Sequence, residues 1–195
     1  YLISPKEINK NFNNKLDKVL SHGNVKFFQL RLKNTNKNSL LKIAKKIRKI
    51  TLKHKVKFII NDYYSLVKKV KADGCHMGQL DGSIKIAKNK LKNKILGVTC
   101  HNSYKLARDA VINKVSYLAF GSFYKSKLKP KAKKANYAIL KRVKKNFNQP
   151  IVVIGGINSI NYKKLLLNKA NFLAISSYIW NNKKLKPHQA INNLK

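Results

Sequence analysis

The sequence predicts a single α/β domain over residues 1–195, built as a compact (β/α)8 TIM barrel. Three observations support this fold class. Eight short apolar runs are spaced along the chain, each is followed by a stretch with helical spacing, and no linker or low-complexity segment interrupts the alternation. Such alternation favours a parallel sheet with right-handed crossovers, and eight units favour a closed barrel. An open, doubly wound sheet is the alternative that the pattern leaves.

The predicted strands are apolar on both faces and rich in Val, Ile, Phe and Leu, as buried parallel strands are. They are residues 1–4, 27–32, 57–61, 74–77, 95–99, 117–121, 151–155 and 172–176. The chain has 195 residues, fewer than the roughly 250 that are typical of this architecture, so we expect short loops.

Between the strands, apolar residues recur every three or four positions, which is typical of helices that cover a sheet. The first helix also carries a start signal, with Ser4 as N-cap, Pro5 in the first turn and Glu7 placed to complete a capping box. We therefore expect a helix that begins at Pro5 and a structural role for Glu7. Asp17 and Asp109 fall within predicted helices and are expected to be solvated.

The charge balance is strongly basic, with 44 Lys and Arg against 6 Asp and Glu and a net charge of +38. One interpretation is an electrostatic footprint for nucleic acid or another polyanion. The other is a compositional drift towards Lys and Asn. The lysines are spread along the whole chain and no nucleic-acid-binding motif is present, so we favour drift and expect no nucleic-acid partner. The positive field would still attract anionic substrates.

Nothing in the sequence predicts a membrane or secreted protein. No apolar run approaches the ~20 residues that span a bilayer, and no stretch has the pattern of a signal peptide. Cys75 and Cys100 are expected to be free thiols. We therefore predict a cytoplasmic protein without a membrane partner; a homo-oligomer remains open.

Functional groups of parallel α/β folds lie beyond the carboxyl ends of the strands. The second predicted strand ends with Gln29, Arg31 and Lys33 on one face, while Leu30 and Leu32 alternate onto the other. The chain has only four arginines, and arginine offers a planar fork for phosphate that lysine lacks. A polar stripe of this kind favours a phosphate site over a merely solvated strand end.

Two of the six acids also follow neighbouring strands. Asp62 comes after Asn61 at the end of the third strand, and Asp81 follows the fourth. Mg²⁺ prefers one or two carboxylates together with phosphate oxygens and water. Each aspartate alone could instead form an Asx-turn or cap a helix. Together, beside Arg31 and Lys33, they favour a Mg²⁺–diphosphate site.

The later strand ends carry hydroxyl groups, glycines and one histidine. Thr99 could hydrogen-bond a ligand, whereas His101 fits a site residue or a helix start equally well. The pair Gly155-Gly156 after the seventh strand and the pair Ser176-Ser177 after the eighth stand where such barrels often bind a phosphate on backbone N–H groups.

The segments QLRLK, IIND, GCHMGQLD, LGVTCHN, FGSFYKSKLK, VIGGI and AISSYI resemble, in order and spacing, the thiamine-phosphate synthase family. The resemblance covers essentially the whole chain. It implies a TIM-barrel transferase of thiamine biosynthesis that joins hydroxymethylpyrimidine diphosphate to a thiazole phosphate, in carboxylated form or not. The diphosphate would leave first, and the thiazole nitrogen would capture the resulting pyrimidine-methyl cation.

The resemblance also implies roles for individual residues. Those implied to bind the pyrimidine diphosphate are Gln29, Arg31, Lys33, Asn61, Thr99 and Lys129, of which Arg31, Lys33 and Lys129 would act on the departing diphosphate. Asp62 and Asp81 would hold Mg²⁺. Those implied to bind the thiazole phosphate are Ser126, Gly155, Gly156, Ser176 and Ser177.

One loop departs from the family pattern. The family usually has Pro-Thr-x-Thr-Lys, whereas this chain has Lys125-Ser126-Lys127-Leu128-Lys129. Leu128 thus replaces one of two hydroxyl groups expected near the thiazole phosphate.

Three alternatives follow from these observations. A thiazole tautomerase would share the barrel and would use His101 as an acid–base group, but it would need no Mg²⁺–diphosphate site. A degenerate synthase would agree with Leu128. A non-catalytic polyanion- or RNA-binding protein would agree with the net charge and would lose affinity with salt.

Overall fold

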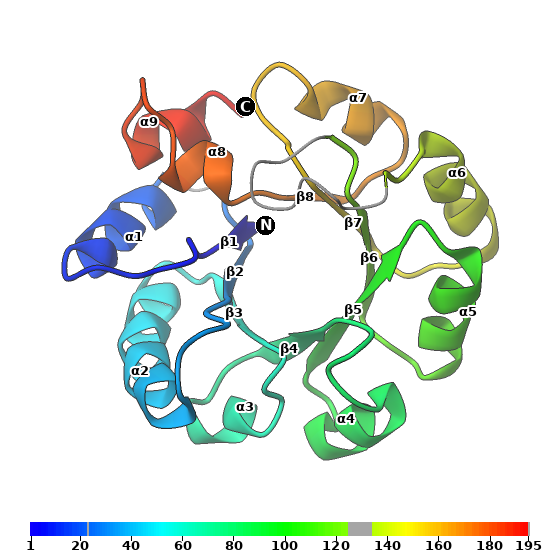
Figure 1. The fold of residues 1–195 in the computed structure, drawn as a ribbon, viewed down its shortest axis with the longest axis horizontal. Coiled ribbons are helices and arrows are strands. Elements are labelled where there is room, and N and C mark those ends of the chain that lie inside the picture. Colours follow the sequence, from blue (N-terminus) through cyan, green and yellow to red (C-terminus); the bar gives the residue numbers. More distant parts are fainter. Residues whose placement is uncertain (23, 125–133, 195) are drawn as a thin grey trace.

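A computed structural model describes residues 1–22, 24–124 and 134–194, which form a ring of parallel strands surrounded by helices (Figure 1). The strands are β1 (Leu2–Ile3), β2 (Phe27–Leu30), β3 (Lys57–Asn61), β4 (Gly74–Met77), β5 (Ile95–His101), β6 (Tyr117–Gly121), β7 (Ile151–Ile154) and β8 (Phe172–Ala174).

The ring is closed. Each strand pairs in parallel with the next in chain order from β1 to β8, and a bridge between Leu2 and Ile175 joins the last strand to the first. Two bonds of 2.9 Å complete this junction, because Ile3 N–H donates to the Ile175 carbonyl and Ile175 N–H donates to the Tyr1 carbonyl. The closed (β/α)8 barrel is therefore confirmed, and the open sheet is excluded.

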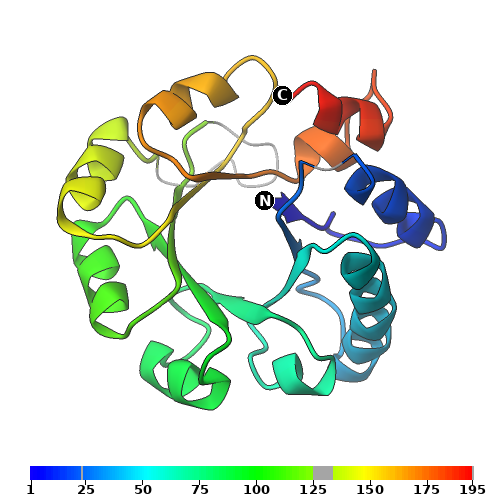
Figure 2. The ribbon, with the colours of Figure 1, turned by 180° about the vertical axis from the view of Figure 1, so that it is seen from behind.

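The helices cover the outside of the ring, as the view from the opposite side also shows (Figure 2). They are α1 (Phe12–Leu20), α2 (Lys37–Lys53), α3 (Leu66–Lys69), α4 (Ile84–Leu91), α5 (Tyr104–Ile112), α6 (Tyr137–Asn146), α7 (Tyr162–Leu167), α8 (Ser177–Trp180) and α9 (Pro187–Asn192). None of the helices in the described parts of the chain is long and apolar enough to cross a membrane.

The predicted start of the first helix is wrong. Helix α1 begins at Phe12 with Asn11 as its N-cap, and Glu7 is exposed in a bend before it. Ser4 is buried, and its hydroxyl oxygen accepts the Arg31 N–H at 2.9 Å. The hydroxyl that would cap a helix at Pro5 is thus engaged in joining the end of β1 to the end of β2.

Apolar side chains fill two separate spaces. The larger core lies between the strands and the helices and includes the fully buried Phe28, Phe58 and Leu16. A smaller cluster contains Ile3, Tyr117, Ala119, Val152 and Ala174. Because side chains alternate along a strand, this second cluster belongs to the barrel interior, where layers of side chains make a packed core.

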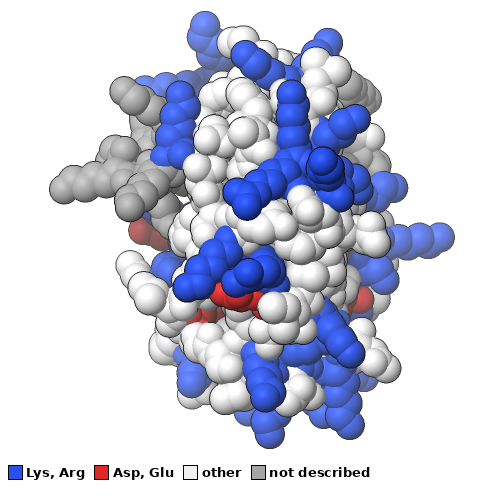
Figure 3. Space-filling model, turned by 90° about the vertical axis from the view of Figure 1, so that its right-hand side faces the viewer, with Lys and Arg blue, Asp and Glu red and all other residues white. Residues whose placement is uncertain are grey.

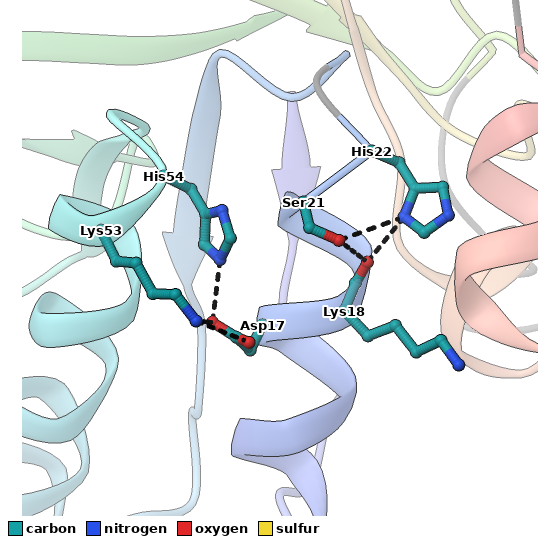
Figure 4. A network of polar contacts seen from close by, with 6 residues as sticks. All are labelled: Asp17, Lys18, Ser21, His22, Lys53 and His54. Atoms are coloured by element: carbon teal, nitrogen blue, oxygen red, sulfur yellow. Dashed lines mark hydrogen bonds and ion pairs between the residues drawn. The ribbon is translucent and has the colours of Figure 1, made fainter.

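Two aspartates stabilise the end of the barrel at which the strands begin. The Asp73 carboxylate lies 2.6 Å from Arg48 Nη1 and accepts the Phe58 N–H at 2.7 Å. Asp17 of α1 lies 2.9 Å from Lys53 Nζ and 2.8 Å from His54 Nε2, both at the end of α2 (Figure 4). These two hydrogen bonds hold the pKa of Asp17 below its usual range. Asp17 is therefore ion-paired, and its side chain is 38% exposed to solvent, in line with the expectation that it is solvated.

Positive charge is not gathered in one place on the face of the molecule that Figure 3 shows. Lys and Arg side chains are scattered over the whole of this face, with few acidic side chains between them (Figure 3). On this face, at least, the Lys and Arg side chains form no single cluster that is separate from the rest of the surface.

Candidate active site

The carboxyl ends of the first five strands bring together most of the residues predicted to bind the pyrimidine diphosphate. Gln29 is buried in β2, and Arg31 and Lys33 follow the strand. Asn61 is the buried last residue of β3, and Thr99 lies near the end of β5. All of these positions are at the same end of a parallel barrel, which we call the mouth.

Asp62 and Asp81 meet at the mouth, where their carboxyl groups lie close enough for each to affect the pKa of the other. The backbone at Asp62 has a φ of 64°, a left-handed conformation in which aspartate is one of the better-tolerated residues. Asp81 accepts the Gly78 N–H at 2.7 Å, which folds the turn after β4 back towards Asp62. A hydrogen bond can join the two carboxyl groups only while one of them is protonated.

Burial and the closeness of the two carboxyl groups shift the pKa values of the pair. Burial, together with the hydrogen bond and the negative charge of Asp81, raises the pKa of Asp62 to about 6. Burial would also raise the pKa of Asp81, but the hydrogen bonds from Asp62 and Gly78 and the charge of Lys33 hold it below its usual range. At neutral pH both groups are ionised for most of the time, which creates a concentration of negative charge at the mouth.

Two cations of the predicted stripe act on this pair. Lys33 Nζ lies 3.9 Å from Asp62 Oδ2, and both Lys33 and Arg31 oppose the rise in the pKa of Asp62. The Lys33 side chain is half exposed, so it is free to reach a ligand, whereas Arg31 is partly buried and its backbone is held by Ser4. The mouth therefore combines an acidic pair with adjacent cations, an arrangement suited to a metal-bound diphosphate.

His76 and Gln79 were missed as supporting residues by the sequence analysis. His76 Nε2 lies 2.8 Å from the Thr99 hydroxyl oxygen, and the Gln79 amide donates to the Thr99 carbonyl. Burial lowers the pKa of His76 to about 4, so its ring is neutral at physiological pH. Strand alternation could have identified His76. Cys75 and Met77 are buried on the helix side of β4, so the His76 side chain between them points into the barrel.

The GG segment after β7 forms a closely packed turn with left-handed backbone conformations. Gly155 and Gly156 have φ values of 111° and 61°. A Cβ on Gly155 would lie only 2.0 Å from the Ser122 hydroxyl oxygen, so glycine is required there both for conformation and for space. The Tyr124 N–H donates to the Gly155 carbonyl at 3.1 Å, and the Asn161 amide donates to the Gly156 carbonyl at 3.0 Å. The turn is therefore held by the elements on both sides of it.

The two serines after β8 have different structural roles. The Ser176 hydroxyl donates to the Ser4 carbonyl at 3.0 Å, which ties the end of β8 to the end of β1. Ser177 begins the short helix α8 and is partly buried. Ser126, Leu128 and Lys129 lie outside the residues that the structure describes.

His101 and Cys100 have different surroundings from the acidic pair. The His101 side chain is exposed, at a backbone φ of 53° that follows a register shift at the end of β5. Cys100 and Cys75 are free and buried, as predicted, and burial raises the pKa of the Cys100 thiol to about 12. Neither thiol is therefore an activated nucleophile.

Within the described residues, no group of three or more His, Cys, Asp or Glu side chains is arranged to hold a metal ion. Two carboxylates are nevertheless within the range that Mg²⁺ uses, because this ion takes its remaining ligands from water and substrate phosphates. The donor set at the mouth, two adjacent carboxylates that otherwise share a proton, thus fits a hard divalent cation.

The chain is similar to known proteins over most of its length. The family model for thiamine monophosphate synthase matches residues 1–179. A thiamine-phosphate synthase from Pelagibacter ubique is 58% identical over an alignment that covers 100% of this chain and 95% of that protein. A thiamine-phosphate synthase from Erythrobacter litoralis is 38% identical, with 92% of this chain and 87% of that protein covered.

Solved structures show the same relationship. A thiamine phosphate pyrophosphorylase from Pyrococcus furiosus superposes with a TM-score of 0.89 at 25% identity, covering 100% of this chain and 92% of that one. A 3-hexulose-6-phosphate synthase shares the fold, with a TM-score of 0.71 at 15% identity over 99% of this chain and 97% of that one. By its sequence over nearly its full length, and by its barrel, this chain belongs to the thiamine-phosphate synthase family of transferases.

Proposed function

We propose that this chain joins hydroxymethylpyrimidine diphosphate to a thiazole phosphate, giving thiamine phosphate and diphosphate, with Mg²⁺ at the Asp62–Asp81 pair. The family membership supports the reaction, and the acidic pair beside Arg31 and Lys33 is the observation that supports the metal-assisted form. The comparisons favour a synthase over the tautomerase, the degenerate homologue and the polyanion-binding protein. We expect the reaction to occur in the cytoplasm.

The reaction breaks the bond between the pyrimidine methylene carbon and the diphosphate oxygen. Both bonding electrons leave with the diphosphate, and the thiazole nitrogen supplies the electron pair of the new carbon–nitrogen bond. No proton has to be removed, so the protein needs no strong base. Its tasks are to stabilise the departing anion and to hold the nucleophile close to the cation.

The leaving group would be stabilised by charge at the mouth. Asp62 and Asp81 would hold Mg²⁺, which when bound neutralises diphosphate oxygens. The same anion would form charge-assisted hydrogen bonds with Arg31 and Lys33. Lys129, which lies outside the residues that the structure describes, would add a third cation. Gln29, Asn61 and Thr99 would hold the pyrimidine end of the substrate.

The thiazole phosphate would bind on the other side of the mouth. The Gly155-Gly156 turn offers backbone N–H groups without side chains to block them. Because the Ser176 hydroxyl already donates to Ser4, the N–H groups of the serine pair and the Ser177 hydroxyl remain for the phosphate. Ser126 would contribute from its loop.

Diphosphate release tests this proposal. Release should require both substrates and Mg²⁺ together, and thiamine phosphate should form in equal amount. Changing Asp62 to Ala should weaken the response to Mg²⁺, whereas His101→Ala should leave turnover intact. A proton shift in the thiazole substrate alone, lost in His101→Ala, would instead establish the tautomerase.

A further inference from the structure

We propose that Tyr1, Tyr117 and His76 form a one-directional hydrogen-bond chain inside the barrel that positions Gln29 and Thr99 and makes the Thr99 hydroxyl a donor to the ligand. The ligand contacts of Gln29 and Thr99 rest on the proposed function. The chain itself is a property of the protein without substrate, so the two can be tested separately.

Four hydrogen bonds connect Gln29 on β2 with Thr99 on β5. Gln29 Nε2 donates to the Tyr1 hydroxyl oxygen at 3.0 Å, and the hydroxyl oxygens of Tyr1 and Tyr117 are 2.7 Å apart. The Tyr117 hydroxyl oxygen lies 2.9 Å from His76 Nδ1, and His76 Nε2 lies 2.8 Å from Thr99 Oγ1. Every link is within normal hydrogen-bond distance, so the chain is continuous across the barrel.

This path is possible because Gly97 on β5 has no side chain. In register, His76 on β4, Gly97 on β5 and Tyr117 on β6 stand side by side. A Cβ on Gly97 would lie 1.8 Å from the Tyr117 ring, so only glycine lets the ring lie across β5 and reach His76. The His76 and Tyr117 rings stack at 5.7 Å with an angle of 14° between them, which fixes the hydroxyl group against Nδ1.

The direction of the protons follows from the first bond. Because Gln29 donates, Tyr1 accepts on its oxygen, and the arrangement that leaves no buried hydroxyl proton unpaired directs the Tyr1 proton towards Tyr117. Tyr117 then donates to His76 Nδ1. With Nδ1 as an acceptor, the neutral imidazole carries its proton on Nε2 and donates to Thr99 Oγ1. The Thr99 proton is left to point away from His76, towards a third group.

The same argument disfavours a charged imidazole in the intact chain. A protonated His76 would donate from Nδ1 to the Tyr117 oxygen, which would turn the Tyr117 proton towards Tyr1. Tyr1 would then accept from both Gln29 and Tyr117, and its own buried proton would have no acceptor within the chain. His76 is therefore a positioning residue, with a fixed tautomer and no acid–base part in the chain.

Thr99 is held from a second direction by the same segment. The Gln79 amide donates to the Thr99 carbonyl, three residues after His76 holds the hydroxyl group. The backbone and the side chain of Thr99 are thus both fixed by the turn that also carries Asp81. This arrangement presents a single donor at a fixed position, which suits an acceptor atom such as a ring nitrogen or a phosphate oxygen.

The tautomer of His76 tests the chain without any substrate. Long-range ¹H–¹⁵N spectra at a fixed neutral pH should show His76, assigned by its loss in His76→Gln, as a neutral ring protonated on Nε2. Tyr117→Phe keeps the stacked ring but removes the donor to Nδ1, so the signal should shift towards a tautomer mixture. Tyr137→Phe removes a comparable phenol bond, to Tyr124 at 3.0 Å, and should leave the signal unchanged. A proton on Nδ1, or no change in Tyr117→Phe, would overturn the proposal.

Turnover then tests the effect on the ligand. Tyr117→Phe should raise KM for the pyrimidine substrate by roughly 3- to 10-fold, the size of one hydrogen bond, and leave KM for the thiazole substrate unchanged. In a Thr99→Val background the same change should add little, because the end of the chain is already removed. The proposal would be contradicted if Tyr117→Phe raised KM by the same factor in wild type and in Thr99→Val. It would also be contradicted if KM rose equally for both substrates. An inactive wild-type protein with the expected tautomer would refute the proposed function and leave the chain established.

Discussion

The two ends of the barrel use their aspartates in opposite ways. At the base, where the strands begin, Asp73 is paired with Arg48 and a backbone N–H, and Asp17 with Lys53 and His54 (Figure 4). At the mouth, Asp62 and Asp81 are paired with each other. In a chain with 44 cations and 6 acids, cationic partners are easily supplied. Two carboxylates that face each other, with Lys33 3.9 Å from Asp62 as the nearest ion-paired cation, agree better with our proposed cation site than with a role in stability.

The largest expected effect is on turnover at the mouth. Asp62→Asn keeps a hydrogen-bonding group beside Asp81 but removes one negative charge. We expect kcat/KM to fall by roughly 10²–10³-fold, as when a preorganised electrostatic group is removed from a site, with no loss of thermal stability. Asp17→Asn, a charge change of the same size at the base, should leave kcat/KM unchanged. Similar losses of kcat/KM in Asp62→Asn and Asp17→Asn would contradict the proposed difference between the mouth and the base.

The next effect is on stability at the base. Asp73→Asn removes the partner of Arg48, whose side chain is only 16% exposed, and leaves its charge unpaired. We expect a loss of about 3 kcal/mol in the free energy of unfolding, which corresponds to a fall of roughly 6–12 °C in Tm for a chain of this size. Urea and thermal melts measure it. Below the transition the variant should retain wild-type kcat/KM; a loss of activity with unchanged stability would contradict the structural role.

The smallest effect is on the pH dependence of stability without metal. The pKa of Asp62 is raised to about 6 in the folded protein, above the usual ~3.9 of the unfolded chain. Between these values the folded state retains a proton that the unfolded state has lost, so this contribution to stability is complete below pH ~4 and is lost as the pH rises through about 6. Because the Asp62 side chain is partly exposed to solvent and faces Lys33, we expect a change of only about 1 kcal/mol over this range, and the lowered pKa of Asp81 acts outside it, below pH ~4.

Melts with EDTA between pH 4.5 and 7.5, in wild type and Asp62→Asn, measure this difference. The variant should lack the decline that the wild type shows across this range. If stability declined with pH equally in both proteins, the decline would come from groups other than Asp62.

Much of the barrel followed from the sequence because its strands are short, buried runs between helices. Three of the eight predicted strands, 57–61, 74–77 and 117–121, match the structure to the residue. The start of the first helix failed because Ser4 had two possible partners. Local spacing favours the helix N-terminus, but the Arg31 N–H is 27 residues away and only the folded sheet brings it to the hydroxyl group.

The candidate site divides in the same way. The carboxyl ends of neighbouring strands must lie close together, so the approach of Asp62 to Asp81 and of Lys33 to both could be predicted from the alternation alone. The chain from Gln29 to Thr99 could not. It depends on the Tyr117 ring lying across β5 at Gly97, and that requires the register of three strands as well as their order.

The affinity of Mg²⁺ as a function of pH tests most directly whether the acidic pair at the mouth is a cation site. Titration calorimetry at pH 5 to 8 should show an affinity that rises with pH by up to about tenfold per unit below pH 6 and levels off above it, because the cation replaces the shared proton. Asp62→Asn should abolish this binding, and Asp17→Asn should not alter it. Binding of equal strength in wild type and Asp62→Asn, or an affinity that does not change with pH, would contradict the account.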